Sequence, residues 1–507
     1  MNKRVMNLVN FVRGCEPREE TDLFTPTAEE IKLDKEFGMP HTFLLQYDAL
    51  IRPDFQELFL KEADENMEIG LWFEMNRPLT EKVGIEWRGR PGYDWDWYVN
   101  PGFLPAYTPA QREALIDEAF RLFKEIFGYY PQVAGSWLLD SHSMAYMSDK
   151  YDMKAFCICR EQLAVDAYTL WGGYYNGGYY PSRNNMICPA QTEENTVKTP
   201  VYRMLGIDPL YGIDIRKFAG DRLFGCPTME PVWGPGANAD VVDWYFKTYY
   251  ENPCLAQAHA TTGQENSFGW PGIGPGYRMQ IEKLDKLVKE GKVVVEKLGD
   301  TGAAMQAATP VTPACAMVAL EDWAHDADDA EHQCRSAWYS CKNYRANLFA
   351  CGKKLFFRDV QKYDDRYAER YLVNPCTAWD ATYDNLPMMD NTTWSTEGVE
   401  AGIVFDGEFV DMTVSESGST LEVVASFAAG KKVTVVFTED GMTVTGCDAL
   451  HYVLGTPKPT VAAEGNVLVY NHNGFGYKIP TSGVEKTAEG YDIVAANGSI
   501  TVDMTDR

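Results

Sequence analysis

The sequence lacks the features that mark membrane-spanning and disulfide-bonded proteins. No apolar run approaches the roughly 20 residues that a transmembrane helix needs. The 12 cysteines are scattered and form no CxxC pair, which favours a reduced, intracellular protein. The N-terminal segment MNKRVMNLVNFVRG is interrupted by Asn7 and Asn10 and reaches Arg13, so it predicts a strand rather than a signal peptide. We therefore expect a cytoplasmic protein without a membrane partner.

Positive charge is also scarce. Lys and Arg total 46 against 73 Asp and Glu, which gives a formal net charge of −27. Such a chain is repelled by nucleic acids and by anionic membrane surfaces, so we expect neither as a partner. The balance remains compatible with an anionic small substrate, provided that arginines lie in the binding site.

Aromatic residues, by contrast, are abundant, with 13 Trp, 29 Tyr and 24 Phe. The densest polar segment that contains them is YDWDWYVNPGF, which includes Trp95 and Asp96. A single aromatic residue is most often a packing residue. Trp and Tyr next to carboxylates, however, match the apolar faces and the hydroxyls of a sugar ring. The segment therefore predicts a carbohydrate site.

The first part of the chain alternates short apolar runs with amphipathic segments. RVMNLVNFV, HTFLLQYDAL, MEIGLWFEM and QVAGSWLLD predict strands, with helices between them. The clearest helix has Thr108 as its cap and ends at Gly128. An earlier helix is predicted with Thr27 as its cap and Gly38 at its end. This rhythm predicts parallel strands joined by helical crossovers.

Two further helices are predicted at residues 328–349 and 364–372, after a middle region of long loops rich in Gly and Pro. The repeated units indicate an α/β fold, a TIM-like or NodB-like (β/α) barrel over residues 1–388 that forms the catalytic domain. Residues 389–507 instead alternate with period two between turn residues. This pattern predicts an antiparallel β-sandwich accessory domain.

Residues 1 to about 160 resemble the NodB-like polysaccharide deacetylase superfamily and its glycosidase relatives. The resemblance lies in FGMPHTFLLQYDAL, in MEIGLW and in REALIDEAFRLFKEIFGYYPQVAGSW. In the deacetylases, the segment that matches EIGLW carries a metal-binding His, but this chain has Trp72 there and no HxxxH pattern. The resemblance therefore disfavours a metal-dependent deacetylase, and we expect no metal ion or cofactor.

The segment LLDSHSM, with Asp140 and His142, is similar to a signature of the inverting sialidase family 156 of glycoside hydrolases. That family combines a barrel with a C-terminal β-domain and uses a His as general acid and a carboxylate as general base. The family base is an Asp near the end of the first strand, where this chain departs by offering Glu16. Arg203 in VYRMLG matches an arginine that holds the substrate carboxylate. The resemblance also implies a homodimer.

The residues themselves support a related chemistry. Glycoside hydrolysis needs a proton donor and a group that activates or replaces water, and carboxylates commonly supply both. The candidate carboxylates at strand ends are Glu16, Asp48, Asp140, Glu230 and Glu265. A strand-end acid is about as often a loop cap as a catalyst. We predict His142 as the acid, polarised by Asp140, and Glu16 as the base.

Further side chains are predicted to hold the sugar. The substrate-binding candidates are Arg203, Asp48, Arg88, Trp95, Asp96, Glu230, Gln264, Glu265 and Asn343. Arginine can bind a substrate carboxylate through two parallel hydrogen bonds. Structural explanations compete with each assignment. Arg88 fits a surface salt-bridged loop, Arg203 fits a buried ion pair with Asp208 or Glu230, and Asn343 fits a packing residue on a helix.

The leading hypothesis is therefore a glycoside hydrolase, an inverting exo-sialidase that releases terminal sialic acid from a sialoglycan or oligosaccharide. Three alternatives stay open: a glycosidase for another sugar, a carbohydrate deacetylase with a different ligand set, and a catalytically inactive carbohydrate-binding protein.

Overall fold

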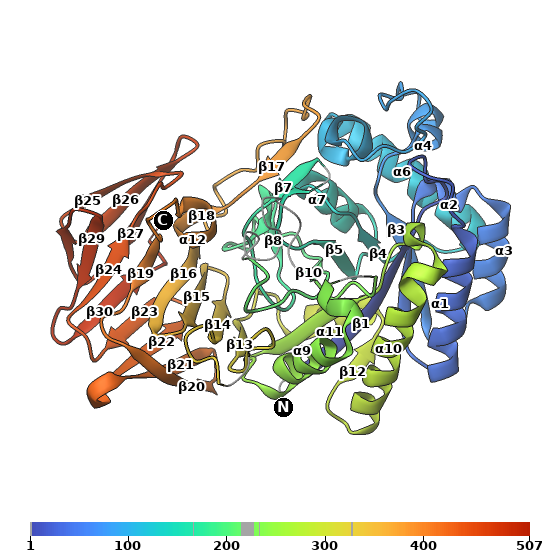
Figure 1. The fold of residues 1–507 in the computed structure, drawn as a ribbon. Coiled ribbons are helices and arrows are strands. Elements are labelled where there is room, and N and C mark those ends of the chain that lie inside the picture. The colour runs from blue at the N-terminus through green and yellow to red at the C-terminus, as the bar shows by residue number, and fades with distance from the viewer. Residues whose placement is uncertain (1–2, 166, 214–227, 233, 326–327, 507) are drawn as a thin grey trace.

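The structure, a computed structural model, describes residues 3–165, 167–213, 228–232, 234–325 and 328–506. A parallel, nearly closed barrel with surrounding helices forms the N-terminal part, and antiparallel sheets form the C-terminal part (Figure 1). The predicted fold class is therefore confirmed. Among the described residues, none of the helices is long and apolar enough to cross a membrane.

The barrel is built from parallel strands in the order β10-β5-β4-β3-β2-β1-β11, with β12 also paired to β1. The strands are β1 (Lys3–Val12), β2 (His41–Leu45), β3 (Met67–Trp72), β4 (Val133–Gly135), β5 (Ala155–Cys159), β10 (Val201–Met204), β11 (Gln257–Thr262) and β12 (Val294–Glu296). Every residue of β2 and β5 is buried, as expected where both faces of a parallel sheet are covered. The N–H of Gly206 donates to the carbonyl of Thr261 at 3.0 Å, which joins the chain after β10 to β11.

Helices cover the outside of the barrel (Figure 1). The longer ones are α1 (Phe24–Phe37), α3 (Pro53–Glu62), α6 (Pro109–Phe127), α7 (Ser141–Lys150), α9 (Ala239–Glu251), α10 (Trp270–Lys289) and α11 (Leu298–Ala308). The short ones are α2 (Tyr47–Leu50), α4 (Arg77–Lys82), α5 (Val99–Gly102), η1 (Leu104–Ala106), η2 (Gly234–Ala237) and η3 (Asn266–Phe268).

Local sequence signals account for the ends of two helices. Thr108 and Gln111 form a capping box at the start of α6, and Gly128 ends it in the left-handed conformation, both as predicted. Helix α1 ends at Gly38 as predicted, but Thr27 lies inside the helix rather than at its cap. The earlier start follows from Asp22, whose carboxylate accepts hydrogen bonds from the N–H groups of the first turn.

Small sheets lie between the barrel and the C-terminal part. Strands β6 (Gln162–Val165), β7 (Tyr168–Leu170) and β17 (Ala381–Tyr383) form one, and β8 (Pro181–Ser182) and β9 (Asn185–Pro189) form another. Residues 364–372, predicted as a helix, form turns instead. The carboxylate of Asp364 accepts the N–H of Arg366 at 3.0 Å, a local contact that favours a turn over a helix.

The helix predicted at residues 328–349 is also wrong, because this region forms β14 (Cys334–Ser340) and part of β15 (Tyr344–Cys351). These strands are buried on both faces, so they do not show the alternation of a half-exposed strand. Trp338 packs with barrel residues, and the next residue, Tyr339, packs with the C-terminal core. One face of the sheet therefore packs against the barrel, and the other face packs in the C-terminal core.

Most of the C-terminal part belongs to three antiparallel sheets. A nine-stranded sheet has the order β13-β14-β15-β16-β19-β24-β29-β28, with β18 paired to β16. Its other strands are β13 (Cys315–Ala319), β16 (Lys354–Lys362), β18 (Leu386–Asp390), β19 (Gly402–Val404), β24 (Ala449–Val453), β28 (Val484–Lys486) and β29 (Gly490–Val494). The second sheet contains β20 (Phe409–Ser417), β21 (Thr420–Phe427), β22 (Lys432–Thr438), β23 (Gly441–Thr445) and β30 (Ser499–Asp503). The third contains β25 (Thr460–Glu464), β26 (Val467–His472) and β27 (Phe475–Pro480). Two short helices, α12 (Asn391–Trp394) and η4 (Ala428–Gly430), complete this part.

The nine-stranded and five-stranded sheets share one apolar core. Phe437 of β22 lies 5.6 Å from Tyr339 and 6.1 Å from Phe357, measured between ring centroids. The nine-stranded sheet begins at Cys315, before the predicted domain boundary at residues 388/389. Division of the chain at that boundary stays a prediction.

Candidate active site

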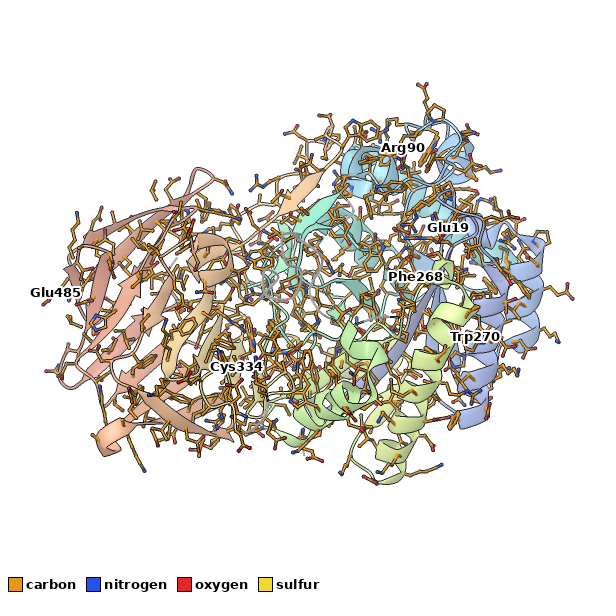
Figure 2. The ribbon with its side chains drawn as sticks, viewed as in Figure 1. Glu19, Arg90, Phe268, Trp270, Cys334 and Glu485 are labelled. Atoms are coloured by element: carbon orange, nitrogen blue, oxygen red, sulfur yellow. The ribbon has the colours of Figure 1, made fainter. Side chains whose placement is uncertain are left out.

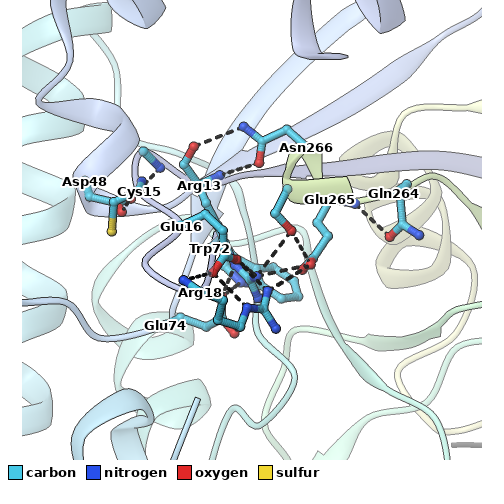
Figure 3. Close-up of polar contacts among 12 residues, drawn as sticks. Arg13, Cys15, Glu16, Arg18, Asp48, Trp72, Glu74, Gln264, Glu265 and Asn266 are labelled. Atoms are coloured by element: carbon cyan, nitrogen blue, oxygen red, sulfur yellow. Dashed lines mark hydrogen bonds and ion pairs between the residues drawn. The ribbon is translucent and has the colours of Figure 1, made fainter. Parts of the chain in front are cut away.

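Charged side chains gather where β1, β3 and β11 end, at one mouth of the barrel (Figure 3). Arg13 follows β1, Glu74 follows β3, and Glu265 follows β11. The carboxyl ends of parallel strands face the same side of a barrel, which is where barrel enzymes place their catalytic groups. These three residues, with Glu16 and Arg18, are called the mouth cluster below.

Arg13 lies at the centre of the mouth cluster, with 3% of its side chain exposed. Its Nε and Nη2 donate to the two carboxylate oxygens of Glu74 at 3.1 and 3.2 Å. Its Nη1 and Nη2 lie 3.1 and 2.9 Å from the oxygens of Glu265. Glu16 approaches the same guanidinium at 3.6 Å. One buried cation therefore holds three carboxylates together.

Arg18 is the second cation of the cluster and the more accessible one, with 37% of its side chain exposed. Its guanidinium donates to both oxygens of Glu16 at 2.7 and 2.5 Å. One of its nitrogens also lies 3.9 Å from Glu265. With Glu74 included, three carboxylates share two guanidinium groups, so full ionisation leaves one negative charge in excess.

The pKa values of two carboxyl groups of the cluster are shifted in opposite directions. Burial raises the pKa of Glu74, and the neighbouring Arg13 offsets this only in part. Burial also acts on Glu16, but hydrogen bonds from Arg18 outweigh it and lower the pKa of Glu16. A pair of carboxyl groups whose pKa values are pushed apart is suited to act as proton donor and ionised partner.

Aromatic rings surround the cluster. The guanidinium of Arg13 lies 4.0 Å from the ring centroid of Trp95, a cation–π contact. The indole N–H of Trp72 donates to Glu74 at 2.9 Å, while its ring stacks on Phe11 with centroids 4.4 Å apart. Trp72 thus fills the position that the deacetylase resemblance assigns to a metal ligand, and it lies inside the barrel core.

Backbone-anchoring side chains fix the loop that carries Arg13 and Glu16. Asp48 accepts hydrogen bonds from the N–H groups of Gly14 and Cys15 at 2.9 and 3.0 Å. Asn266 both accepts from the N–H of Arg13 and donates to its carbonyl, each at 3.0 Å. Asp48 was predicted to bind substrate, but its described contacts are those of a loop anchor.

Two other predicted residues lie beside the cluster. The side-chain N–H₂ of Gln264 donates to Glu230 at 3.2 Å, and its carbonyl oxygen accepts the N–H of Glu265 at 2.8 Å. The structure therefore brings together Glu16, Trp95, Gln264, Glu265 and Glu230 from four segments of the chain.

The structure does not bring His142 to Asp140. His142 Nε2 lies 3.0 Å from the carboxylate of Glu113 on α6. Asp140 instead caps α7 by accepting the N–H of Ser143, and it pairs with the buried Arg112 at 2.8 Å. The carboxylate that contacts His142 is therefore Glu113, not Asp140 as predicted.

Arg203, predicted to hold the substrate carboxylate, is 1% exposed. Its Nη1 donates to Glu161 at 3.1 Å and to the carbonyl of Gly172 at 2.6 Å. Glu161 also accepts from Arg345 at 2.5 Å. The expected ion pair of Arg203 therefore exists, but its partner is Glu161 rather than Asp208 or Glu230.

The remaining predicted binders have structural contacts. Arg88 donates to the carbonyl of Ala106 at 3.1 Å, and Asp96 pairs with Arg90 at 2.9 Å. Asn343 lies between β14 and β15, not on a helix, and donates to the carbonyl of Glu439 at 2.8 Å. None of these contacts joins the mouth cluster.

Sequence reasoning missed Arg13, Arg18 and Glu74. Arg13 directly follows the strand predicted from RVMNLVNFV, so its position at a strand end was a usable signal. Glu74 lay inside the predicted strand MEIGLWFEM, which ends earlier in the structure, at Trp72. Arg18 has no comparable signal, because it lies in a loop and is recruited through Glu16.

Comparisons with known proteins bear on the fold. No protein-family model and no curated protein matches the chain. Among solved structures, a candidate glycoside hydrolase/deacetylase from Parabacteroides distasonis has a TM-score of 0.55 at 14% identity, covering 76% of this chain and 91% of that one. A candidate polysaccharide deacetylase from Mycobacterium smegmatis has a TM-score of 0.35 at 12% identity, covering 61% and 93%. The first likeness extends to the fold alone, and the resemblance to the sialidase family stays a prediction.

Proposed function

We propose that the chain is a carbohydrate-active hydrolase, a glycoside hydrolase whose reaction takes place at the mouth cluster. The observation that carries this proposal is the gathering of Glu16, Glu74 and Glu265 around two arginines, beside Trp95, where barrel strands end. Carboxyl groups with divergent pKa values supply the acid and the base of glycosidic cleavage. The fold shared with a glycoside hydrolase/deacetylase is compatible with this reaction class.

In this proposal Glu74 keeps a proton and donates it to the leaving oxygen, and ionised Glu16 activates the attacking water. The opposite pKa directions of the two groups support the assignment. Glu265 holds Arg13 in place. His142 is the alternative proton donor that the family resemblance implies, and its contact with Glu113 gives it a carboxylate partner of its own.

The finer proposal is an inverting exo-sialidase. A sialoside carries a carboxylate at its anomeric carbon, so the site needs an arginine that the substrate can reach. Arg203 is buried with Glu161, whereas 37% of the Arg18 side chain is exposed at the cluster. Arg18 is therefore the arginine that we assign to the substrate carboxylate.

The test is release of free sugar from a panel of methyl glycosides that includes methyl α-sialoside. We expect turnover by the wild type and loss of about a hundredfold or more in Glu16→Gln, the scale of a lost acid or base. Glu408→Gln is the matched control, because that carboxylate is exposed, pairs with Lys353 and directly precedes β20 of the five-stranded sheet.

Three outcomes would contradict parts of the proposal. Acetate release from acetylated glycans without glycoside cleavage favours the deacetylase alternative. Turnover of another glycoside but not of the sialoside removes the sialidase assignment alone. Loss of activity in His142→Asn with full activity in Glu74→Gln assigns the proton donor to His142.

A further inference from the structure

A chain of aromatic rings leads from the mouth cluster to the surface. Arg13 lies 4.0 Å from the ring of Trp95, and Trp95 lies 6.2 Å from Trp97, between centroids. Trp97 stacks with Tyr98 at 5.7 Å and 28°. Tyr98 then meets Trp379 at 4.7 Å and 71°, an edge contact. The last ring comes from a segment far along the sequence, so the fold itself completes the path.

Trp379 is the exposed end of this path, with 51% of the residue accessible. Its segment is held against the loop after Tyr98. The N–H of Val99 donates to the carbonyl of Trp379 at 2.9 Å, and the side chain of Asn100 donates to the carbonyl of Thr377 at 3.2 Å. The N–H of Cys376 donates to the carbonyl of Pro105 at 2.9 Å. The exposed indole is therefore presented by a fixed backbone.

The inner rings of the path are also fixed. Arg90 pairs with Asp96 through two hydrogen bonds of 2.9 Å, and its guanidinium lies 3.9 Å from the ring of Trp97. Arg90 lies among the helices and loops at the top of the view (Figure 2). Tyr98 and Trp379 therefore meet at a steep angle, and both rings remain accessible, Tyr98 in part and Trp379 to about half.

We propose that Tyr98 and Trp379 form a sugar-binding subsite for a distal ring of an oligosaccharide whose first ring lies at the mouth cluster. The proposal rests on the proposed function, because it takes the cluster as the reacting site. Pyranose rings have apolar C–H faces that pack on indole and phenol rings. The substrate class that follows is an oligosaccharide rather than a monosaccharide glycoside with a small leaving group.

The experiment compares two substrates in wild type and Trp379→Ala. Methyl α-sialoside has one ring, and sialyllactose continues into two more. We expect KM for sialyllactose to rise about tenfold in Trp379→Ala, with KM for the methyl glycoside unchanged. Trp379→Phe should recover most of the loss. Val373→Ala is the matched control, since Val373 is exposed on the same segment and 66% accessible.

A binding measurement separates this proposal from the reaction. Isothermal titration with sialyllactose, chitotriose and maltotriose does not depend on turnover when it is carried out in the Glu16→Gln background, with and without Trp379→Ala, because Glu16→Gln lacks the proposed base. Binding of at least one trisaccharide that weakens in Trp379→Ala supports the subsite even if no glycoside is cleaved. Equal affinities with and without Trp379→Ala, or no binding of any of the three by Glu16→Gln, overturn it.

A separate observation concerns two cysteines on neighbouring strands of the nine-stranded sheet. Cys334 begins β14, Cys351 ends β15, and the two are directly opposite in the strand register. Their Sγ atoms lie 2.9 Å apart. The pair is a non-hydrogen-bonded one, because the N–H of Gly352 donates to the carbonyl of Gln333 beside it. Such pairs have Cα atoms about 4.5 Å apart, within the range that a disulfide spans.

The geometry points to a disulfide between Cys334 and Cys351 when the protein meets a small-molecule disulfide such as oxidised glutathione. Cys351 is partly exposed, and its thiolate attacks one glutathione sulfur, which releases one glutathione thiolate. The thiolate of Cys334 then attacks Sγ of Cys351 and releases the second. The two thiols lose two protons and two electrons, and one oxidised glutathione becomes two reduced ones. Cys334 lies where the sheet faces the barrel (Figure 2).

Peptide mapping without reductant tests this after incubation with oxidised glutathione. We expect a linked pair of peptides containing Cys334 and Cys351, and a thiol count lower by two. Cys351→Ser should remove the link, and Cys157→Ser should keep it, because Cys157 is buried in the barrel. A thermal unfolding curve checks that each variant is folded. An unchanged thiol count, stable glutathione adducts or links between other cysteines overturn the proposal.

Discussion

Arg13 neutralises carboxylates that the fold has removed from water. It contacts Glu74, Glu265 and Glu16, and only 3% of its side chain is exposed. Removal of one partner of a buried ion pair leaves an uncompensated charge, which costs about 3–5 kcal/mol. We therefore expect Arg13→Met to lower the free energy of unfolding by this amount in urea denaturation.

Lys247→Met is the control for that variant, because Lys247 pairs with Glu321 at the surface with both side chains about half exposed or more, so its loss should cost about 1 kcal/mol or less. A loss of similar size in both variants would show that burial does not decide the contribution of Arg13.

The pH dependence of kcat/KM follows from Glu74 and Glu16, whose pKa values are shifted in opposite directions. Activity requires protonated Glu74 and ionised Glu16 under the proposed roles. Because the pKa of Glu74 is raised, activity should fall as pH rises through a value above that of an ordinary Glu. Because the pKa of Glu16 is lowered, activity should fall on the acid side only below the ordinary range.

The variant Glu74→Gln separates this mechanism from one based on His142. We expect residual activity in Glu74→Gln without the alkaline decrease in a pH–rate profile. An alkaline decrease that persists in Glu74→Gln and disappears in His142→Asn would assign it to the imidazole.

For single residues, the sequence was informative where a side chain suited to sugar chemistry lies at a strand end or in a loop. Glu16, Trp95 and Glu265 were predicted to be functional, and the structure brings them together. Arg203 and Asp140 satisfy the same criteria, yet their charges are used for buried contacts with Glu161 and Arg112. The sequence does not show which residues at the strand ends contact the same charged partner. These contacts decide whether a residue joins the mouth cluster or a buried structural ion pair.

Helix α1 carries an acidic group on the face that packs against the barrel and α10. Glu30 is fully buried, and within the described part of the chain neither carboxylate oxygen has a hydrogen-bond partner. Burial, and then the nearby Asp34, raise the pKa of Glu30 well above its usual value. The folded state therefore retains a proton that the unfolded state releases.

The sign of the resulting pH effect follows from this raised pKa. The folded protein has its full stability below the pKa of about 4.3 of an unfolded Glu, and loses stability as pH rises toward the folded pKa. We expect wild type to lose free energy of unfolding relative to Glu30→Gln as pH rises above the ordinary range of a Glu. Thermal unfolding at several pH values measures this, and Glu29→Gln, on the partly exposed neighbour, should follow wild type. Equal pH slopes in wild type and Glu30→Gln would contradict the assignment.

Elements with clear local signals were predictable, and elements that depend on tertiary burial were not. Helix α6 combines a capping box at Thr108 with Gly128 at its end, and both were visible in the sequence. Strands β14 and β15 show no period-two pattern, because the barrel covers one face and the five-stranded sheet the other. A strand that is buried on both faces cannot be distinguished from a buried helix by its periodicity.

At the scale of the whole molecule, the barrel and the C-terminal sheets are joined through buried contacts. Glu161, which follows β5 of the barrel, accepts from Arg345 of β15 at 2.5 Å, and Arg345 pairs in turn with Asp359 of β16 at 2.8 Å. Tyr175 stacks on Trp338 of β14 with centroids 3.7 Å apart. The change in hydrophobic periodicity predicted two parts, but it could not show that one sheet belongs to both cores.

This joint makes the predicted boundary at residues 388/389 testable. The cut would separate β16 from β19, which pair through Phe356 with Val404 and through Phe357 with Ile403. It would also expose the core side of the nine-stranded sheet. We therefore expect a fragment of residues 1–388 to aggregate or to lack a cooperative thermal transition by circular dichroism, while the full chain unfolds in one transition by both circular dichroism and fluorescence. A soluble fragment 1–388 with a sigmoidal transition would instead establish the boundary, because it would show that the barrel and β13–β16 form a sufficient core on their own.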